Sequence, residues 1–533
     1  MMKNFKALLA VLLCLAFVFC AAACGDTPVT DPETPNGPAA GTTRSARTDV
    51  GSADGTTSVA DGNNGGVTSA VGGNNGGAQG GNNGGNNGGA QNGNNGGKVT
   101  GAGSQTSAQN GGAAVGSTAF INSLKGLKIN IWEQRSEKME RGTTSGDRYY
   151  AILNKVGKKY GATITYKAKT DGDLKTSILS GNPEANVISL KDYNIASWIN
   201  SGVCANLNDA MAQTGINFSS PWYDQEIVNF CKFDGKQMCW NATVREPFMI
   251  SYNKRMIQEA RLTDPYTLYE QGKWDYKTFE TYVDKLTKKS ASDEVLIHGF
   301  MSGTGVDLMM MTIGSNGTSA VKASKGKLVS NLTDKKVSNA LNAFRTIESK
   351  TNHGTNWDSC MIYFAQGKSA MSLATKYIFT VINTYGMTDA VGVVPFPSGP
   401  DAKNAKYPVT QSFPTFIAKT DEKDAAKILY VMDEVYKEHY AYREQDFYDD
   451  FRSLIRDEKA YNTFKTFSLD KSKTRVVYDP LAGIIWPPAP QAYHNLSTAL
   501  AKNTVAAAVN THNKSFNTAL NDVWGGVTIT NLK

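Results

Sequence analysis

The feature that most constrains this chain is a long stretch near its N-terminus that contains no aromatic residue. Residues 25–118 hold 26 of the 51 glycines and 13 asparagines, but no phenylalanine, tryptophan or tyrosine. Such a segment cannot bury enough apolar surface to offset the conformational entropy lost on folding. We therefore expect a disordered linker here and a folded body at residues 119–533, where nearly all the aromatic residues lie.

The linker carries the sequence Gly-Asn-Asn-Gly-Gly five times, beginning at Gly62, Gly73, Gly81, Gly85 and Gly93. Irregular spacing and the lack of apolar residues exclude a solenoid, whose repeats bury a shared face. Glycine is not every third residue, so collagen is excluded too. A glycine-rich coil of this length has a root-mean-square span of roughly 50–60 Å. We interpret the segment as a spacer.

The N-terminus has the features of a secretory signal peptide at residues 1–23. Lys3 and Lys6 precede the apolar run 7–23, which is marginal for a membrane span of roughly twenty residues. The run ends in three alanines before Cys24, which resembles the bacterial lipobox, although Ala21 stands where leucine is usual. We expect lipidation of Cys24 and a location on the extracellular face of the cell membrane, because two acyl chains suffice for stable anchoring. Plain secretion and an uncleaved anchor are the alternatives.

Charge and cysteine content exclude some partners. The net charge of +7 is mild, and no run of five basic residues occurs, so we expect no nucleic-acid partner.

Cys231 and Cys239 flank Phe-Asp-Gly-Lys, a plausible hairpin tip, and are either disulfide-bonded across it or free buried thiols. No Cys-x-x-Cys occurs and the five histidines are scattered. We therefore expect no metal site and no cofactor.

The body alternates strand-like and helix-like segments, which indicates an α/β fold with a parallel sheet. The expected strands are 127–132, 163–167, 185–190 and 248–254, with a turn into a further strand at 233–240. The expected helices are 148–160, 174–180, 277–288 and 423–440. Because ligands bind at the carboxyl ends of parallel strands, the residues that follow the first and third strands are candidates for a site.

Five segments, in order, resemble the extracellular solute-binding proteins of bacterial ABC importers, the large carbohydrate-type family. The most specific is the pairing of Tyr-Asn-Lys with Gly-Lys-Trp. The second segment resembles the family's SG-x-x-PDV stretch but lacks its usual aspartate. The five segments are Lys128-Ile-Asn-Ile-Trp132; Ser180-Gly-Asn-Pro-Glu-Ala-Asn-Val-Ile188; Asp234-Gly-Lys with Ser251-Tyr-Asn-Lys254 and Gly272-Lys-Trp-Asp-Tyr276; Phe364-Ala-Gln-Gly-Lys-Ser-Ala-Met371; and Val391-Gly-Val-Val-Pro-Phe-Pro-Ser-Gly-Pro400.

The resemblance implies a two-lobed, hinged fold of the type II periplasmic-binding-protein kind, which closes on a ligand held between its lobes. Lobe 1 would comprise approximately 119–240 and 395–445, and lobe 2 approximately 241–394 and 446–533. It implies a monomeric receptor, not an enzyme, that captures a small solute, a sugar or oligosaccharide, and delivers it to an ABC permease.

Sugars present apolar faces, on which aromatic rings stack, and hydroxyl rims, which charged and amide side chains bind. By position in the family pattern, the expected ligand-binding residues combine these two kinds of side chain. They are Trp132, Glu133, Asp192, Tyr193, Trp240, Lys376, Tyr377, Gln411 and Trp486. Each of these aromatic residues has ordinary core packing as its alternative role, and Tyr252 and Trp274 are expected to be structural.

Two other classes of protein remain open. A secreted carbohydrate-active enzyme needs two carboxylates about 5–10 Å apart, which a sequence does not exclude. Against it, the chain has no Gly-x-Ser-x-Gly, His-Glu-x-x-His or Walker-type motif. A surface adhesin on a flexible stalk would account for the linker but not for the five family-like segments.

Overall fold

The computed structural model describes residues 116–133, 141–168, 174–190, 195–240, 245–355, 358–402, 406–409, 413–476, 491–525 and 528. The chain divides into two units, Met1–Ala102 and Gly103–Lys533, and all the described residues lie in the second. The predicted signal peptide, the linker up to residue 115 and Cys24 lie outside the described residues.

The first lobe is built on a four-stranded sheet with the order β14-β3-β1-β2. Strand β1 (Lys128–Glu133) pairs in parallel with β2 (Thr163–Ala168) on one side and with β3 (Val187–Ser189) on the other. The edge strand β14 (Thr415–Ile417) is antiparallel to β3 and comes from far along the chain. The expected strands and their parallel pairing are confirmed here.

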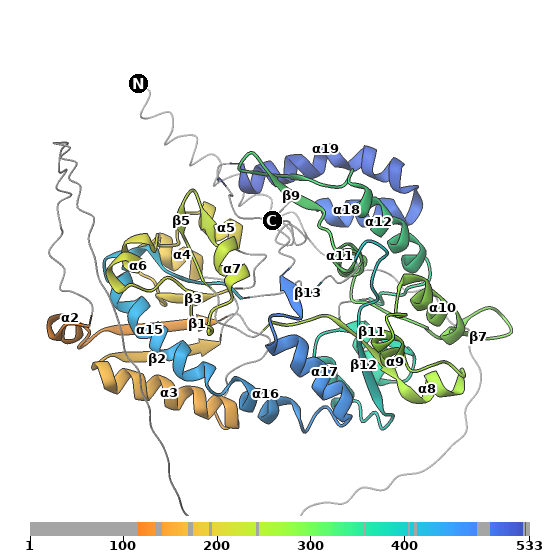
Figure 1. Ribbon diagram of the computed structural model, residues 1–533, viewed down its shortest axis with the longest axis horizontal. Coiled ribbons are helices and arrows are strands. Elements are labelled where there is room, and N and C mark those ends of the chain that lie inside the picture. The colour runs from red at the N-terminus through yellow and green to blue at the C-terminus, as the bar shows by residue number, and fades with distance from the viewer. Residues whose placement is uncertain are drawn as a thin grey trace, which may run out of the picture. The chain divides into compact units, whose positions relative to one another are not determined.

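Alternating side chains of β1 fill two layers, one on each face of this sheet. Ile129 and Ile131 pack with helices α3 (Thr144–Tyr160) and α15 (Ala425–Tyr440), whereas Trp132 points into the opposite layer. Helix α3 begins after Thr143, whose side chain accepts a hydrogen bond from the Gly146 backbone, and ends at a left-handed glycine. Helices α3, α6 and α15 cover one face, and α4 and α5 contribute to the layer on the other (Figure 1).

Three helices of this lobe lie close to the predicted ranges: α3 (Thr144–Tyr160), α4 (Leu174–Leu179) and α15 (Ala425–Tyr440). The hairpin of β4 (Lys232–Phe233) and β5 (Lys236–Gln237) overlaps the predicted turn and strand at 233–240. The elements that the sequence analysis did not predict are α2 (Thr118–Asn122), α5 (Ile195–Asn200), α6 (Asn208–Thr214), α7 (Gln225–Phe230) and the 3-10 turn η2 (Lys419–Asp424).

The second lobe contains a three-stranded sheet with the order β11-β6-β12. Its central strand β6 (Met249–Asn253) is antiparallel to both β11 (Met371–Ala374) and β12 (Val391–Pro395). The expectation of a parallel sheet is therefore wrong for this lobe. All three strands are buried throughout, and a continuous apolar run does not encode the direction of pairing.

The other elements of this lobe surround the sheet or form short hairpins. They are α8 (Lys254–Glu259), α9 (Pro265–Glu270), α10 (Tyr276–Leu286), β7 (Lys288–Lys289), β8 (Val295–Ile297), α11 (Gly305–Ser315), β9 (Val321–Ser324), β10 (Lys327–Ser330), α12 (Lys335–Glu348), α13 (Ser359–Ala365), α14 (Ile378–Thr384), α17 (Glu458–Leu469), α18 (Ala492–Lys502) and α19 (Val505–Trp524).

Several segments connect the two sheets. Residues 245–248 lead into β6, β13 (Tyr407–Val409) pairs in parallel with β15 (Thr474–Val476), and α16 (Arg443–Phe451) follows α15 directly. The last residue of α19, Trp524, stacks on Phe233 of the β4–β5 hairpin with ring centroids 5.4 Å apart. The C-terminal helix therefore contacts the first lobe as well as its own.

Candidate functional site

The carboxyl ends of the three parallel strands meet at one edge of the first sheet. Glu133 at the end of β1 is in register with Ala168 of β2 and Ser189 of β3. Its carboxylate is buried and accepts a hydrogen bond from the Tyr166 hydroxyl at 3.3 Å. This is the edge at which parallel sheets bind ligands.

Helix α16 brings carboxylates to the N-terminal turns of α3. Arg148 of α3 forms ion pairs with Asp446 and with Asp449, the latter at 2.7 Å. Ser145 donates a hydrogen bond to Asp450. Burial raises the pKa of Asp450 above its ordinary value, whereas the hydrogen bond from Arg148 lowers the pKa of Asp449.

A second ion pair joins the end of β11 to the segment that enters β6. The Lys376 ammonium lies 2.8 Å from the Glu246 carboxylate, and both side chains are at most 10% exposed. The same ammonium lies 4.9 Å from the centroid of the Phe451 ring on α16. Its positive charge also opposes the rise in the Asp450 pKa. Lys376 therefore connects second-lobe strand β11 with the acidic helix that contacts α3.

An exposed aromatic ring stands next to this pair. Tyr377 immediately follows Lys376, at the start of α14, and is 37% exposed. Because the preceding residue is buried in an ion pair, the backbone that carries the tyrosine is fixed while its ring faces solvent. A partly exposed ring beside charged groups offers both apolar and polar contacts to a bound molecule.

Arg245 holds the segment that presents Glu246. Its guanidinium binds the buried Asp224 through two hydrogen bonds, of 2.6 and 2.9 Å, and donates to the Thr474 carbonyl at 2.7 Å. Burial by itself would lower the pKa of Arg245, but the hydrogen bonds with Asp224 outweigh it and raise that pKa. Arg245 is therefore a positioning residue that ties the connecting segment to α7 and β15.

The sequence-predicted residues divide into three groups. Trp132 and Glu133 lie together at the end of β1, both buried, and Lys376 and Tyr377 lie together after β11. Trp240 lies elsewhere, enclosed in the first-lobe core. The remaining predicted residues are Asp192, Tyr193, Gln411 and Trp486, which lie outside the described residues.

Trp240 is fully buried, and other aromatic rings surround it. It stacks on Phe218 with ring centroids 5.8 Å apart and meets the Tyr436 ring edge to face. Its backbone pairs with Thr415 of β14. In this structure its ring fills the core that α15 covers, so Trp240 has the alternative role of ordinary core packing.

Sequence reasoning missed several residues of this cluster. Glu246, Arg148 and Asp450 were not predicted, although each had a signal. Arg-Glu at 245–246 lies just after the expected boundary between the lobes near residue 240, and Asp446, Asp449 and Asp450 follow the predicted helix 423–440. These sequence signals were incomplete, because no local sequence pattern shows that α16 folds back against α3.

In the part of the chain that the structure describes, no cluster of three or more histidine, cysteine, aspartate and glutamate side chains could hold a metal ion. Across those same residues, no helix combines the length and the apolar character that crossing a membrane requires. Cys204, Cys231, Cys239 and Cys360 are free and buried, so of the two alternatives for Cys231 and Cys239 the structure has free thiols.

The arrangement of the two sheets defines the class of protein to which this chain belongs. Solved structures with a similar fold include a cyclo/maltodextrin-binding protein complexed with maltotetraose (TM-score 0.53, 14% identity, covering 74% of this chain and 97% of that one). UgpB from Mycobacterium tuberculosis, in complex with glycerophosphocholine, gives a TM-score of 0.52 at 18% identity, covering 74% and 98%. CpMnBP1 with mannotriose bound gives a TM-score of 0.50 at 17% identity, covering 75% of this chain and 100% of that one. The fold is the two-lobed type II periplasmic-binding-protein fold.

The family follows from the sequence itself. Residues 142–430, slightly more than half of the chain, match the model of the bacterial extracellular solute-binding protein family. The chain belongs to this family. Sugar complexes are among the structural neighbours, since the cyclo/maltodextrin-binding protein holds maltotetraose and CpMnBP1 holds mannotriose. No curated protein matches the chain in sequence.

Proposed function

We propose that this protein is a lipid-anchored extracellular receptor that captures a sugar or oligosaccharide between its two lobes and delivers it to an ABC permease. In this proposal residues 119–240 and 395–445 form lobe 1, and residues 241–394 and 446–533 form lobe 2. Cys24 carries the lipid, and residues 25–118 are the tether. The receptor acts as a monomer, without a cofactor and without catalysis.

The observation that carries the proposal is the polar cluster around Lys376. It combines a buried ion pair, a half-exposed tyrosine and the carboxylates of α16, next to the sheet edge at which this fold class binds ligands. Carboxylates accept hydrogen bonds from sugar hydroxyls, and lysine and arginine donate them. The neighbours that hold maltotetraose and mannotriose support the same ligand class.

A thermal-shift panel of mono- and oligosaccharides tests the ligand class. The protein is the secreted chain, residues 24–533, with Cys24→Ser so that it stays in solution. A sugar at one hundred times its dissociation constant should raise the free energy of unfolding by about 2.7 kcal/mol. If no soluble sugar in a broad panel moves the melting curve, the sugar proposal fails. Recovery of the bound sugar in altered form would instead favour the enzyme.

The anchor is tested separately, in cells that export the full chain. Cys24→Ser should move the protein from the membrane fraction into the medium, because the thiol that would carry a diacylglyceryl group is gone. Cys20→Ser is the matched control and should leave the protein in the membrane fraction. If Cys24→Ser leaves the membrane-bound fraction unchanged, lipidation at this cysteine is refuted.

A further inference from the structure

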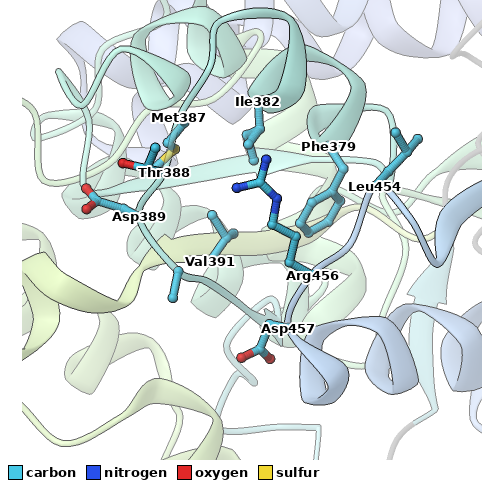
Figure 2. Close-up of a pocket in the computed structure, with 10 residues that line it drawn as sticks. Phe379, Ile382, Met387, Thr388, Asp389, Val391, Leu454, Arg456 and Asp457 are labelled. Carbon is cyan, nitrogen blue, oxygen red and sulfur yellow. The ribbon is translucent and has the colours of Figure 1, made fainter.

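A cavity of about 270 Å³ lies in the second lobe, against helix α14, which follows Lys376 and Tyr377 in the chain. One wall is helix α14, and the opposite wall is the loop between α16 and α17. The third side is the segment that enters β12. Its lining residues include Phe379, Ile382, Met387, Val391, Leu454 and Arg456 (Figure 2).

The cavity begins beside Lys376 and extends away from it. The Phe379 backbone N–H donates a hydrogen bond to the Lys376 carbonyl at 3.1 Å, so one wall adjoins the cluster around Lys376. Val391, also in the lining, pairs with Asn253 at one end of β6, whereas Ala374, two residues before Lys376, pairs with Met249 at the other end. Four residues of extended strand span about 13 Å. The Val391 side of the cavity is therefore the side farther from Lys376.

The floor of the cavity is apolar and well packed. Phe379, Ile382, Met387 and Val391 are each less than 10% exposed. Phe379 also meets Phe464 of α17 edge to face, at 5.8 Å, which fixes its ring. An apolar group that entered this space would lose its contact with water at little cost in protein rearrangement.

The charges at the rim are unequally compensated. Asp389 pairs with Arg255 at 2.9 Å, and this pairing lowers the pKa of Asp389; Asp457 pairs with Lys254. Arg456 is the exception. Its guanidinium donates a hydrogen bond to Asn383 at 3.3 Å, and among the residues that the structure describes no carboxylate lies within ion-pair distance of it.

Arg456 is directed over the cavity. Its side chain extends from the α16–α17 loop toward Ile382 and Phe379 of α14 (Figure 2). The cavity thus combines an apolar floor with one uncompensated guanidinium at its rim. A guanidinium binds carboxylates in a planar, two-hydrogen-bond geometry, and such charge-assisted bonds are about twice as strong as neutral ones.

We propose that this cavity is a second ligand site, which binds a small amphiphilic carboxylate with its hydrocarbon part on Phe379, Ile382 and Met387 and its carboxylate on Arg456. The cavity volume limits the ligand to a small molecule, because sites for drug-sized ligands begin at about 300 Å³.

Hexanoate is the probe, and hexan-1-ol and hexylamine are its neutral and cationic counterparts. Binding to residues 24–533 with Cys24→Ser is measured by isothermal titration calorimetry. Hexanoate should bind at least about tenfold more tightly than hexan-1-ol, because loss of the charge-assisted hydrogen bond removes about a factor of ten or more. Hexylamine should bind more weakly still, since Arg456 repels it.

Two variants locate the binding. Arg456→Gln should weaken hexanoate binding about tenfold and remove the preference over hexan-1-ol, whereas Lys285→Gln, which removes an exposed charge elsewhere in the lobe, should change neither. Leu454→Trp should block both probes by filling the space. The proposal is overturned if hexanoate does not bind, if hexan-1-ol binds equally well, or if Arg456→Gln leaves hexanoate binding unchanged. A melting curve for each variant verifies that it folds.

Discussion

The Lys376 ammonium and the Glu246 carboxylate are 2.8 Å apart and almost completely buried, although 130 residues separate them in the sequence. Removing one partner of a buried ion pair leaves an uncompensated charge, which costs about 3–5 kcal/mol. We therefore expect Lys376→Met or Glu246→Gln to lower the free energy of unfolding by about that amount, measured by urea denaturation. The double variant Lys376→Met, Glu246→Gln should be far less destabilised than the sum of its single changes. Near-additive losses would show that the pair is not coupled.

Tyr377 should contribute to solute binding and little to stability, because its ring is more than one-third exposed. Ring contacts of this kind are worth about 0.5–1.5 kcal/mol. Tyr377→Ala should therefore weaken binding of the sugar found in the panel by roughly two- to tenfold, measured calorimetrically. Tyr385→Ala is the matched control, because Tyr385 is also exposed and lies at the other end of α14. Equal effects of the two changes would remove Tyr377 from the site.

Because of His353, the free energy of unfolding should depend on pH above the range in which an ordinary histidine titrates. Its ring bonds Ser302 at 2.9 Å on one side and Glu348 at 3.0 Å on the other. Burial alone would lower the pKa of His353, but the hydrogen bond and charge of Glu348 outweigh it, so the pKa is raised. The stabilisation is then complete below the unfolded-state pKa of about 6.5 and is lost as pH rises through the folded-state pKa.

The variant His353→Gln isolates this effect. The difference in unfolding free energy between the parent protein and the variant should be larger near pH 5.5 than near pH 8.5. Burial lowers the pKa of His298, so this histidine changes the stability with pH in the opposite sense. Its contribution is present in both proteins and cancels in the difference. A difference that is the same at both pH values would contradict the assigned direction.

The buried thiols should be unreactive in the folded protein. Cys204, Cys231, Cys239 and Cys360 are free, and burial raises the pKa of Cys204, Cys239 and Cys360. The thiolate is the reactive form, so the native chain with Cys24→Ser should resist labelling by iodoacetamide near pH 8. In concentrated guanidinium chloride all four thiols should label, as mass spectrometry would show. Labelling of only two would instead indicate a disulfide.

The periodicity of apolar residues was enough to predict strands β1, β2 and β3 and the long helices of the first lobe, because that pattern is local, but it did not reveal the edge strand β14. The strand expected at 127–132 is β1, and the helix expected at 423–440 is α15. The pattern did not reveal the direction of pairing in the second sheet, since β6, β11 and β12 are buried on both faces.

The sequence alone determined the α/β fold class and the family, and it supplied Trp132-Glu133 and Lys376-Tyr377 as candidates for the site. Only the tertiary structure decided which side chains join them. Ser145 meets Asp450 across 305 residues, and Glu246 meets Lys376 across 130. It also decided that Trp240 fills a core. The physical reason is that a polar pair or a packed ring depends on how distant segments fold against each other, whereas periodicity reports only which face of a single segment is buried.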